Sequence, residues 1–480
     1  MSRQFGTTHT RLAASMLWFA LSIFVTFGAA WAADSPRAAW GTAQRLDATD
    51  FGQAPVIAAD KRGNAIAVWA QFDVNLMQYG LWARRYAAGA GWSAAERVND
   101  YAGQPDRPAL AMNERGEAIA VWAQYGIFDI ANPGPVSSSL WASRFMPGKG
   151  WSKPTQLEGE ATNPNYAVVA MDERGNAIAA WNQTNVALDV SNVYAKRYAA
   201  GAGWGDSRLL QDGTAANSII PQLAMNEHGD ALVAWTRFDP ATYVTTVEAN
   251  RYQRGEGWSG QETVVGSEAG GNPLVGLDGR GNAVALWSRM DPTTSQTNVF
   301  ASRYGVRSGW DKAELLQPGT GVDASNLRLA MNDRGEAVAL WKETIAPNFS
   351  DFTWEIHVNR FVPGKGWEGS QQVGSTATQP VVQMNAQIGM DERGNAVAVW
   401  EFENIAAQTD PYAPPPTNVY AFRYAAGRSW DAGTALQTST ANGSNAQVAV
   451  SAKGDAFATW QEQDMATGAT SLWANRYAKP

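Results

Sequence analysis

The chain has 480 residues and a net charge of −8, and its aromatic residues make up 11% of the total. This much large apolar surface excludes a disordered chain, and the interspersed charges form no basic stripe for nucleic acid. The sequence has no Cys and only three His, which excludes disulfides and thiolate sites and argues against a histidine-built metal centre.

Residues 1–32 have the pattern of a signal peptide. Arg3 and Arg11 come before or at the start of an apolar stretch at 12–30, and Ala30-Trp31-Ala32 fits a small-x-small cleavage site. Because the apolar stretch is longer than usual, an uncleaved membrane anchor is the alternative. We therefore expect an exported protein, periplasmic or extracellular, whose residues 33–480 form one domain.

One motif recurs eight times along the rest of the chain. It begins as DKRGNAIAVW, ending at Trp69, and returns at intervals of 52 to 60 residues with its Trp at positions 122, 181, 235, 287, 341, 400 and 460. Asp, Asn or Ser at the first position and Gly at the fourth are typical of a tight turn with a left-handed fourth residue. The alternating apolar residues that follow predict a β-strand.

Each repeat predicts four strands, which we name A to D in chain order. The turn joins A to B, a variable loop joins B to C, and a Gly-rich turn leads to a strand D that opens with Gly-Trp. This predicts an all-β fold, an eight-bladed β-propeller of four-stranded antiparallel blades. The expected blades cover about 51–99, 100–158, 159–211, 212–265, 266–317, 318–373, 374–437 and 438–480 plus 38–47.

The two ends of the repeat region complement each other. The chain ends on a strand C, SLWANRYAKP, and the eighth repeat has no strand D. Residues 38–47, AAWGTAQRLD, read as a strand D with no preceding A, B or C. Pairing the two would close the ring and leave no free sheet edge there, so we expect residues 38–47 to pair with residues 472–477.

Two residue types repeat in every blade and are predicted to be structural. The strand-B Trp and the Gly-Trp of strand D are expected in the core. One Arg near the end of each strand C is expected to bond the A–B turn of its own blade or to stack on Trp. These arginines are Arg85, Arg144, Arg197, Arg251, Arg303, Arg360, Arg423 and Arg476.

The variable B–C loops place the expected binding site on the face of the ring where they lie, around its central axis, because a specific site requires differences between blades. The polar residues expected there follow the strand-B Trp by two positions or lie near the start of a strand A. The predicted ligand-binding set is Gln71, Gln124, Gln183, Arg237, Arg289, Arg328, Glu343 and Glu462. The neighbouring acids Asp73, Asp239, Asp291, Glu401, Glu403 and Asp464 have the chemistry of cation ligands or of a general acid and base.

The repeat resembles those of secreted bacterial propellers and is distantly similar to the Asp-box repeat of sialidases, in which an Asp-and-Gly turn lies next to a strand Trp. Here Asp60, Gly63 and Trp69 carry this likeness, at different spacings. The resemblance implies a propeller architecture for essentially all of the mature chain, and it implies no chemistry. Only Arg237 and Arg289 lie at positions comparable to the arginines of sialidases, so no catalytic residue is carried over.

Three functions remain open. The first is an exported, non-catalytic protein that binds a glycan or protein ligand on the B–C face, since no nucleophile–base motif is present. The second is a glycoside hydrolase or polysaccharide lyase that uses loop carboxylates, and the third is a structural disk in an envelope assembly. We expect a monomer with no cofactor, no nucleic-acid partner and no membrane contact after signal cleavage. The loop carboxylates would suit calcium, but no calcium motif supports it, and the metal content is left open.

Overall fold

The structure is a computed structural model of the chain. It describes residues 39–74, 76–99, 103–126, 138–158, 163–185, 190–213, 217–265, 270–317, 322–348, 351–374, 381–404 and 415–478. The predicted signal segment at 1–32 lies outside these residues. No helix long and apolar enough to cross a membrane occurs in the described part of the chain.

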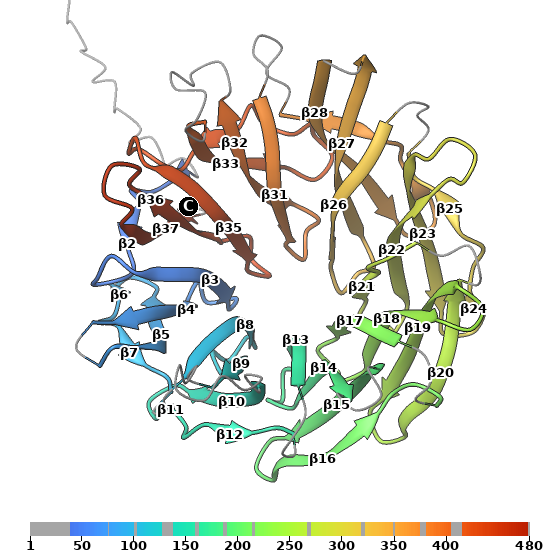
Figure 1. Cartoon of the computed structure of the whole chain (residues 1–480), viewed down its shortest axis with the longest axis horizontal. Helices are drawn as coiled ribbons and strands as arrows, with labels where there is room; N and C mark the ends of the chain where they lie inside the picture. Colours follow the sequence, from blue (N-terminus) through green and yellow to red (C-terminus); the bar gives the residue numbers. More distant parts are fainter. Residues whose placement is uncertain are drawn as a thin grey trace, which may run out of the picture. The chain divides into compact units, whose positions relative to one another are not determined.

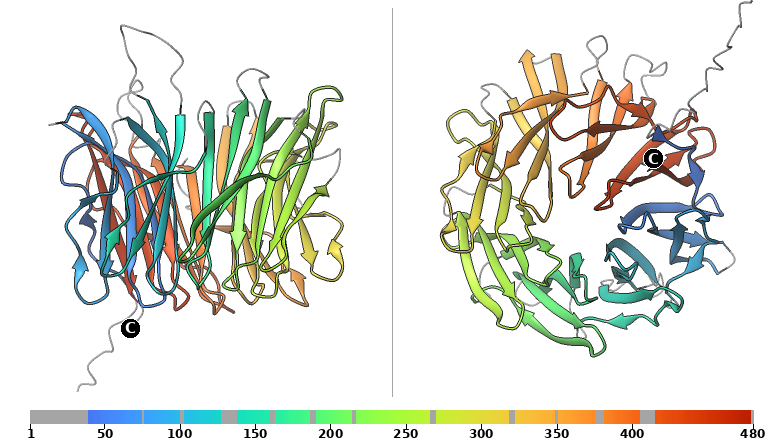
Figure 2. Two further views of the ribbon diagram at one scale, coloured as in Figure 1. Left: turned by 90° about the horizontal axis from the view of Figure 1, so that it is seen from below. Right: turned by 180° about the vertical axis from the view of Figure 1, so that it is seen from behind.

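Eight antiparallel sheets form a ring, which confirms the predicted eight-bladed β-propeller (Figure 1). The innermost strand of each blade is strand A. These strands are β3 (Gly52–Ala59), β8 (Gln104–Met112), β13 (Asn163–Met171), β17 (Asn217–Met225), β21 (Leu274–Leu277), β26 (Val322–Met331), β31 (Val381–Met390) and β35 (Asn442–Val450). Figure 2 shows the strands running from one face of the ring to the other.

Strands B and C follow outward in every blade. Strand B is β4 (Ala65–Asp73), β9 (Ala118–Tyr125), β14 (Ala177–Asn185), β18 (Ala231–Asp239), β22 (Ala283–Met290), β27 (Ala337–Asn348), β32 (Ala396–Asn404) or β36 (Ala456–Gln463). Strand C is β5 (Gln78–Ala87), β10 (Ser138–Met146), β15 (Val190–Ala199), β19 (Val244–Gln253), β23 (Thr297–Gly305), β28 (Asp351–Val362), β33 (Thr417–Tyr424) or β37 (Thr470–Ala478).

The outer strand D is short and often broken in two. It is β6 (Gly91–Trp92) with β7 (Glu96–Arg97), β11 (Gly150–Trp151) with β12 (Thr155–Gln156), β16 (Gly203–Leu209), β20 (Gly257–Val265), β24 (Gly309–Trp310) with β25 (Glu314–Leu315), β29 (Gly366–Trp367) with β30 (Gln371–Val373), β34 (Thr434–Ala435), and β1 (Ala39–Trp40) with β2 (Gln44–Arg45). The last pair belongs to the eighth blade.

The ring closes as the sequence predicts. Strand β1 pairs with β37 in the register Ala39↔Ala478, and β2 pairs with β37 in the register Gln44↔Ala474. Leu46 follows β2, is fully buried, and donates its backbone N–H to the Leu472 carbonyl at 2.7 Å. The closure therefore joins the two ends by backbone pairing and by an apolar contact.

The A–B turns form as predicted. In the first blade the Asp60 carboxylate accepts the backbone N–H groups of Arg62 at 2.8 Å and of Asn64 at 2.9 Å. Gly63 has a φ of +77°, a left-handed conformation that costs least for glycine. This turn fixes where strand B starts and so which of its residues face the next blade.

The repeated aromatic residues hold neighbouring blades together. All eight strand-B Trp side chains are at most 1% exposed, which confirms the core prediction for this set. The eight strand-C arginines have a structural role, but each stacks on the ring of a Tyr or Phe in the next blade at 4.4–5.8 Å and not on the predicted Trp. The last of them, Arg476, stacks on Tyr86 of the first blade, so this set also closes the ring.

Candidate functional site

Each blade has one residue with a positive φ six residues before the A–B turn, within strand A in seven blades and just before it in the fifth. These residues are Ala54 (48°), Arg107 (44°), Tyr166 (49°), Ile220 (52°), Asn272 (57°), Asn326 (53°), Asn385 (50°) and Asn445 (54°). In seven blades the register to strand B shifts here, as in a β-bulge. The result is a ring of irregular residues on the innermost strands, nearer to the B–C face.

Four consecutive blades use Asn at this position, and Asn is the non-glycine residue that best tolerates a left-handed backbone. A bulky side chain there costs about 1–2 kcal/mol. Arg107, Tyr166 and Ile220 accept this cost on three adjacent blades, and of these only Arg107 and Tyr166 carry polar groups. Backbone strain of this kind is concentrated at functional sites, so we take these two residues as the starting point of the candidate site.

Arg107 and Tyr166 contact each other and extend into a small polar cluster. The Arg107 guanidinium carbon lies 4.8 Å from the centre of the Tyr166 ring. The Arg107 Nε is 3.5 Å from the Asp106 carboxylate, and the Tyr125 hydroxyl donates to Asn165 Oδ1 at 3.1 Å. The Arg107 side chain is 57% exposed and Tyr166 is 42% exposed, so both are open to a ligand.

The electrostatics of the cluster favour proton donation next to a fixed cation. Burial raises the pKa of Tyr125, and the charge of Asp106 raises it further. A hydrogen bond to Tyr166 raises the pKa of Arg107, which keeps the guanidinium charged. A phenol that retains its proton can serve as a general acid, and a guanidinium suits a carboxylate or sulfate.

Five of the eight predicted ligand-binding residues have a structural partner. Their side-chain oxygen accepts the indole N–H of the strand-B Trp two positions earlier, at 2.8–3.2 Å. These residues are Gln71, Gln124, Gln183, Glu343 and Glu462, and all but Gln183 are buried. Because strand residues two apart share a sheet face, each lies beside the Trp between blades and offers little surface to a ligand. Ligand binding by this set stays a prediction.

The three predicted arginines lie in different places and are not brought together. Arg237 and Arg289 take the same position after the strand-B Trp but cannot accept its N–H, and Arg289 lies 4.4 Å over the Phe300 ring. Arg237 has a buried Nε that meets no hydrogen-bond partner in the described part of the chain. Arg328 is on β26 in the sixth blade, and burial lowers its pKa.

Glu343 also belongs to a second polar cluster, around His357. The His357 Nε2 is 3.1 Å from Glu355 and 3.4 Å from Glu343, and its Nδ1 is 3.1 Å from the Ser370 hydroxyl. The imidazole stacks on Trp341. His357 occupies the strand-C position that carries an aromatic residue in most blades, so this cluster fits a substitution within the core of the blade.

The predicted loop acids do not converge. Asp239, Asp291 and Asp464 each accept backbone N–H groups within their own B–C turn. Glu401 is buried, and burial raises the pKa of both Glu401 and Glu403. Within the described ranges, no group of three or more His, Asp or Glu residues is arranged to hold a metal ion.

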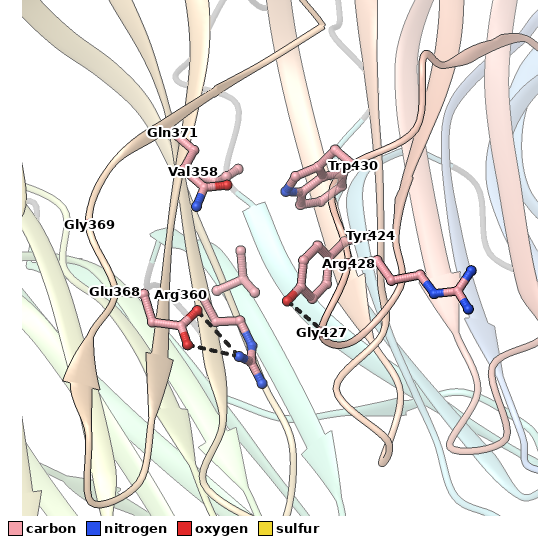
Figure 3. Close-up of a pocket in the computed structure, with 10 residues that line it drawn as sticks. Val358, Arg360, Glu368, Gly369, Gln371, Tyr424, Gly427, Arg428 and Trp430 are labelled. Atoms are coloured by element: carbon pink, nitrogen blue, oxygen red, sulfur yellow. Dashed lines mark hydrogen bonds and ion pairs between the residues drawn. The ribbon is translucent and has the colours of Figure 1, made fainter.

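A cavity of about 250 Å³ lies at the rim between the sixth and seventh blades (Figure 3). Arg360, Glu368, Tyr424 and Trp430 line it, and Arg360 pairs with Glu368 at 3.3 Å. A second rim cavity takes the equivalent place between the second and third blades around Arg144. Because both consist mainly of residues that repeat from blade to blade, we assign them to blade packing.

Sequence reasoning missed Arg107, Tyr125 and Tyr166. One signal in the sequence could have found the first and last of them. Asn recurs six residues before the A–B turn in the last four blades, and Asn in a strand indicates a left-handed residue. Arg107 and Tyr166 occupy the same column and contradict that preference.

No protein-family profile matches the sequence, and no curated protein matches it. Solved structures show the same architecture at low identity. The polysaccharide lyase Uly1 is 10% identical with a TM-score of 0.50, over 91% of this chain and 99% of that one. An ulvan lyase is 9% identical with a TM-score of 0.47, over 79% and 95%. The α-L-arabinanase of Penicillium chrysogenum is 12% identical with a TM-score of 0.39, over 65% and 92%. At these identities the likeness concerns the propeller fold alone.

Proposed function

We propose that this protein binds a polysaccharide containing uronic acid on its B–C face and cleaves it by β-elimination. The observation that carries this proposal is the Arg107–Tyr166 contact, two strained and exposed residues on adjacent inner strands, next to the Tyr125 hydroxyl. The propeller fold shared with the polysaccharide lyase Uly1 is compatible with it.

The chemistry follows from the three side chains. Arg107 pairs with the uronate carboxylate and so makes the proton on the neighbouring C5 more acidic. The Tyr166 oxygen, deprotonated in the form of the site that reacts, takes that proton, the C4–O bond breaks, and a C4–C5 double bond forms. Tyr125, which burial keeps protonated, gives its proton to the departing oxygen. The two phenols thus exchange roles, and proton return between them restores the site.

Elimination fits the cluster better than hydrolysis does. A glycoside hydrolase needs two carboxyl groups on opposite sides of the scissile bond, about 5–10 Å apart. Asp106 is the one carboxylate that contacts Arg107 among the residues described. The cluster therefore lacks the second carboxyl group that hydrolysis needs among the residues described. An arginine and two phenols suit elimination instead, in which the substrate itself carries the carboxylate.

The test is incubation of the purified protein with a panel of uronate polysaccharides, following the ultraviolet absorbance of the new double bond. Tyr166→Phe and Tyr125→Phe are each expected to lower turnover by about 100-fold or more. The matched control is Tyr243→Phe, a Tyr on a B–C loop that is 82% exposed and should not affect turnover. Binding of the same polysaccharides without any new double bond would refute cleavage and return the non-catalytic binding function.

Export, and the periplasmic or extracellular location that it gives access to, would bring the protein to such a polysaccharide. Both remain part of this proposal. A fusion of residues 1–32 to a reporter, assayed for secretion, tests them separately from the chemistry.

A further inference from the structure

The sixth blade carries positive charge at two positions where the other blades do not. The first position is two residues after the strand-A bulge. The sixth blade has Arg328 there, and the other blades have uncharged residues: Val56, Ala109, Val168, Gln222, Leu274, Gln387 and Gln447. The second position directly follows the strand-B Trp. The sixth blade has Lys342 there, and the other blades have Ala70, Ala123, Asn182, Thr236, Ser288, Glu401 and Gln461. The fold of the other seven blades does not need these two positive charges, so their presence in the sixth blade requires another explanation.

The second position has a structural role elsewhere in the ring. In the fourth blade, Thr236 Oγ1 accepts the backbone N–H of Asn272, the irregular residue of the next blade, at 2.9 Å. In the seventh blade, Glu401 accepts the N–H of Ala446 in the next blade at 3.2 Å. A lysine ammonium has only donors, so Lys342 cannot serve in this role.

Arg328 and Lys342 lie on the same face of their sheet. Arg328 pairs with Leu340, and Lys342 is two residues further along the same strand. Leu340 packs into the apolar cluster of the seventh blade, so this face points to that blade. Residues related in this way are diagonal neighbours, within reach of long side chains.

Neither cation has an acidic partner among the residues that the structure describes. Arg328 donates from Nε to Gln387 Oε1 at 3.1 Å and from a terminal nitrogen to its neighbouring Leu327 carbonyl at 2.7 Å. Lys342 has no hydrogen bond or ion pair to any residue that the structure describes. Burial lowers the pKa of both groups, and a partly buried cation without a counterion destabilises a fold. The charge of Lys342 thus costs stability without a hydrogen bond in return, and the charge of Arg328 is offset only by bonds to neutral oxygens.

We propose that Arg328 and Lys342 form an anion-binding site between the inner strands of the sixth and seventh blades, which holds a carboxylate or sulfate ester of the polysaccharide. This inference rests on the proposed function and extends it to the ring wall across from Arg107. A guanidinium and an ammonium together supply several donors to an oxyanion. The site selects an acidic chain that carries a second anionic group away from the bond that is cleaved.

Two variants test the site with residues that the repeat itself uses. Arg328→Gln copies the seventh and eighth blades, and Lys342→Ser copies the fifth, so both are expected to fold. The double variant should bind oligogalacturonate and sulfated galactan oligosaccharides at least about tenfold more weakly. A neutral cello-oligosaccharide should bind both proteins alike. Lys312→Gln, which removes an exposed lysine from the fifth blade, is the matched control and should change nothing.

Stability separates a ligand site from a structural one. If the two cations serve a ligand, the double variant should melt at a higher temperature than the wild type in the absence of anions, because two uncompensated charges are removed. A lower melting temperature would assign them a structural role and overturn the proposal.

Inorganic sulfate tests the site without any polysaccharide. Sulfate should raise the melting temperature of the wild type more than that of the double variant. Equal responses of the two proteins to sulfate and to both acidic oligosaccharides would overturn the site. Because this comparison needs no cleavage, it still decides the proposal if the polysaccharides are bound but not cleaved. The two oligosaccharides then distinguish a carboxylate from a sulfate ester as the bound group.

Discussion

We predict that replacing the strained pair at the candidate site stabilises the protein, although most substitutions destabilise a fold. Replacing both Arg107 and Tyr166 by Asn gives these blades the residue found at the same position in the last four blades. Each bulky left-handed residue costs about 1–2 kcal/mol, and Asn recovers part of that. The lost cation–π contact at an exposed site is worth about 0.5–1 kcal/mol. The difference favours the double variant by on the order of 1 kcal/mol.

Thermal unfolding measures this difference. For a protein of this size a gain on the order of 1 kcal/mol raises the melting temperature by about 1–2 °C. The same variant should lose polysaccharide cleavage. The control with the opposite expected result is Asn272→Ala. Ala tolerates a left-handed φ of 57° less well than Asn does, so this variant should melt at a lower temperature. A double variant that melts below the wild type would show that the pair stabilises the fold and would refute the proposed backbone strain.

Three further predictions concern the fold. Leu46→Ala leaves a cavity at the ring closure and should cost about 2–5 kcal/mol. Proteolysis should then begin in the eighth blade, whereas Leu157→Ala in the second blade should cost as much without exposing the chain ends. Gln71→Leu leaves the buried Trp69 N–H without an acceptor and should cost about 1–3 kcal/mol, but Gln71→Glu, which copies the sixth and eighth blades, should be nearly neutral by chemical denaturation. Burial raises the pKa of Glu114 to about 7, so the folded state favours its protonated form. The melting temperature should fall as the pH rises from about 5 to about 8, with a shallower slope in Glu114→Gln, and a rise over this range would contradict the assignment.

The chemistry of the repeat explains why the fold could be predicted so fully. Each A–B turn is fixed by local hydrogen bonds, such as those of Asp60, and each strand B by an alternation of apolar residues that ends in a buried Trp. These signals depend on neighbours within a few residues, and eight copies reinforce one another. The closure could be predicted because residues 38–47 lack a partner that only the chain end supplies.

The candidate site depended on contacts that the sequence does not encode locally. The position two residues after the strand-B Trp reads as an exposed polar site, yet Gln71 and its equivalents face the neighbouring blade and bond the indole. The register of a strand decides whether a residue faces the core or a ligand. One irregular residue in strand A moves the side chains that precede it in that strand to the opposite sheet face.

The sequence by itself determined the number of blades, their turns, their tryptophan core and the circular closure, because each of these follows from local and repeated patterns. Only the tertiary structure decided that Arg107 meets Tyr166 across two blades and that Arg328 and Lys342 share one sheet face without a counterion. Those juxtapositions depend on a left-handed residue in an inner strand and on the packing of adjacent blades. Arg107 and Tyr166 are more than 50 positions apart in the sequence, and no local pattern records their contact.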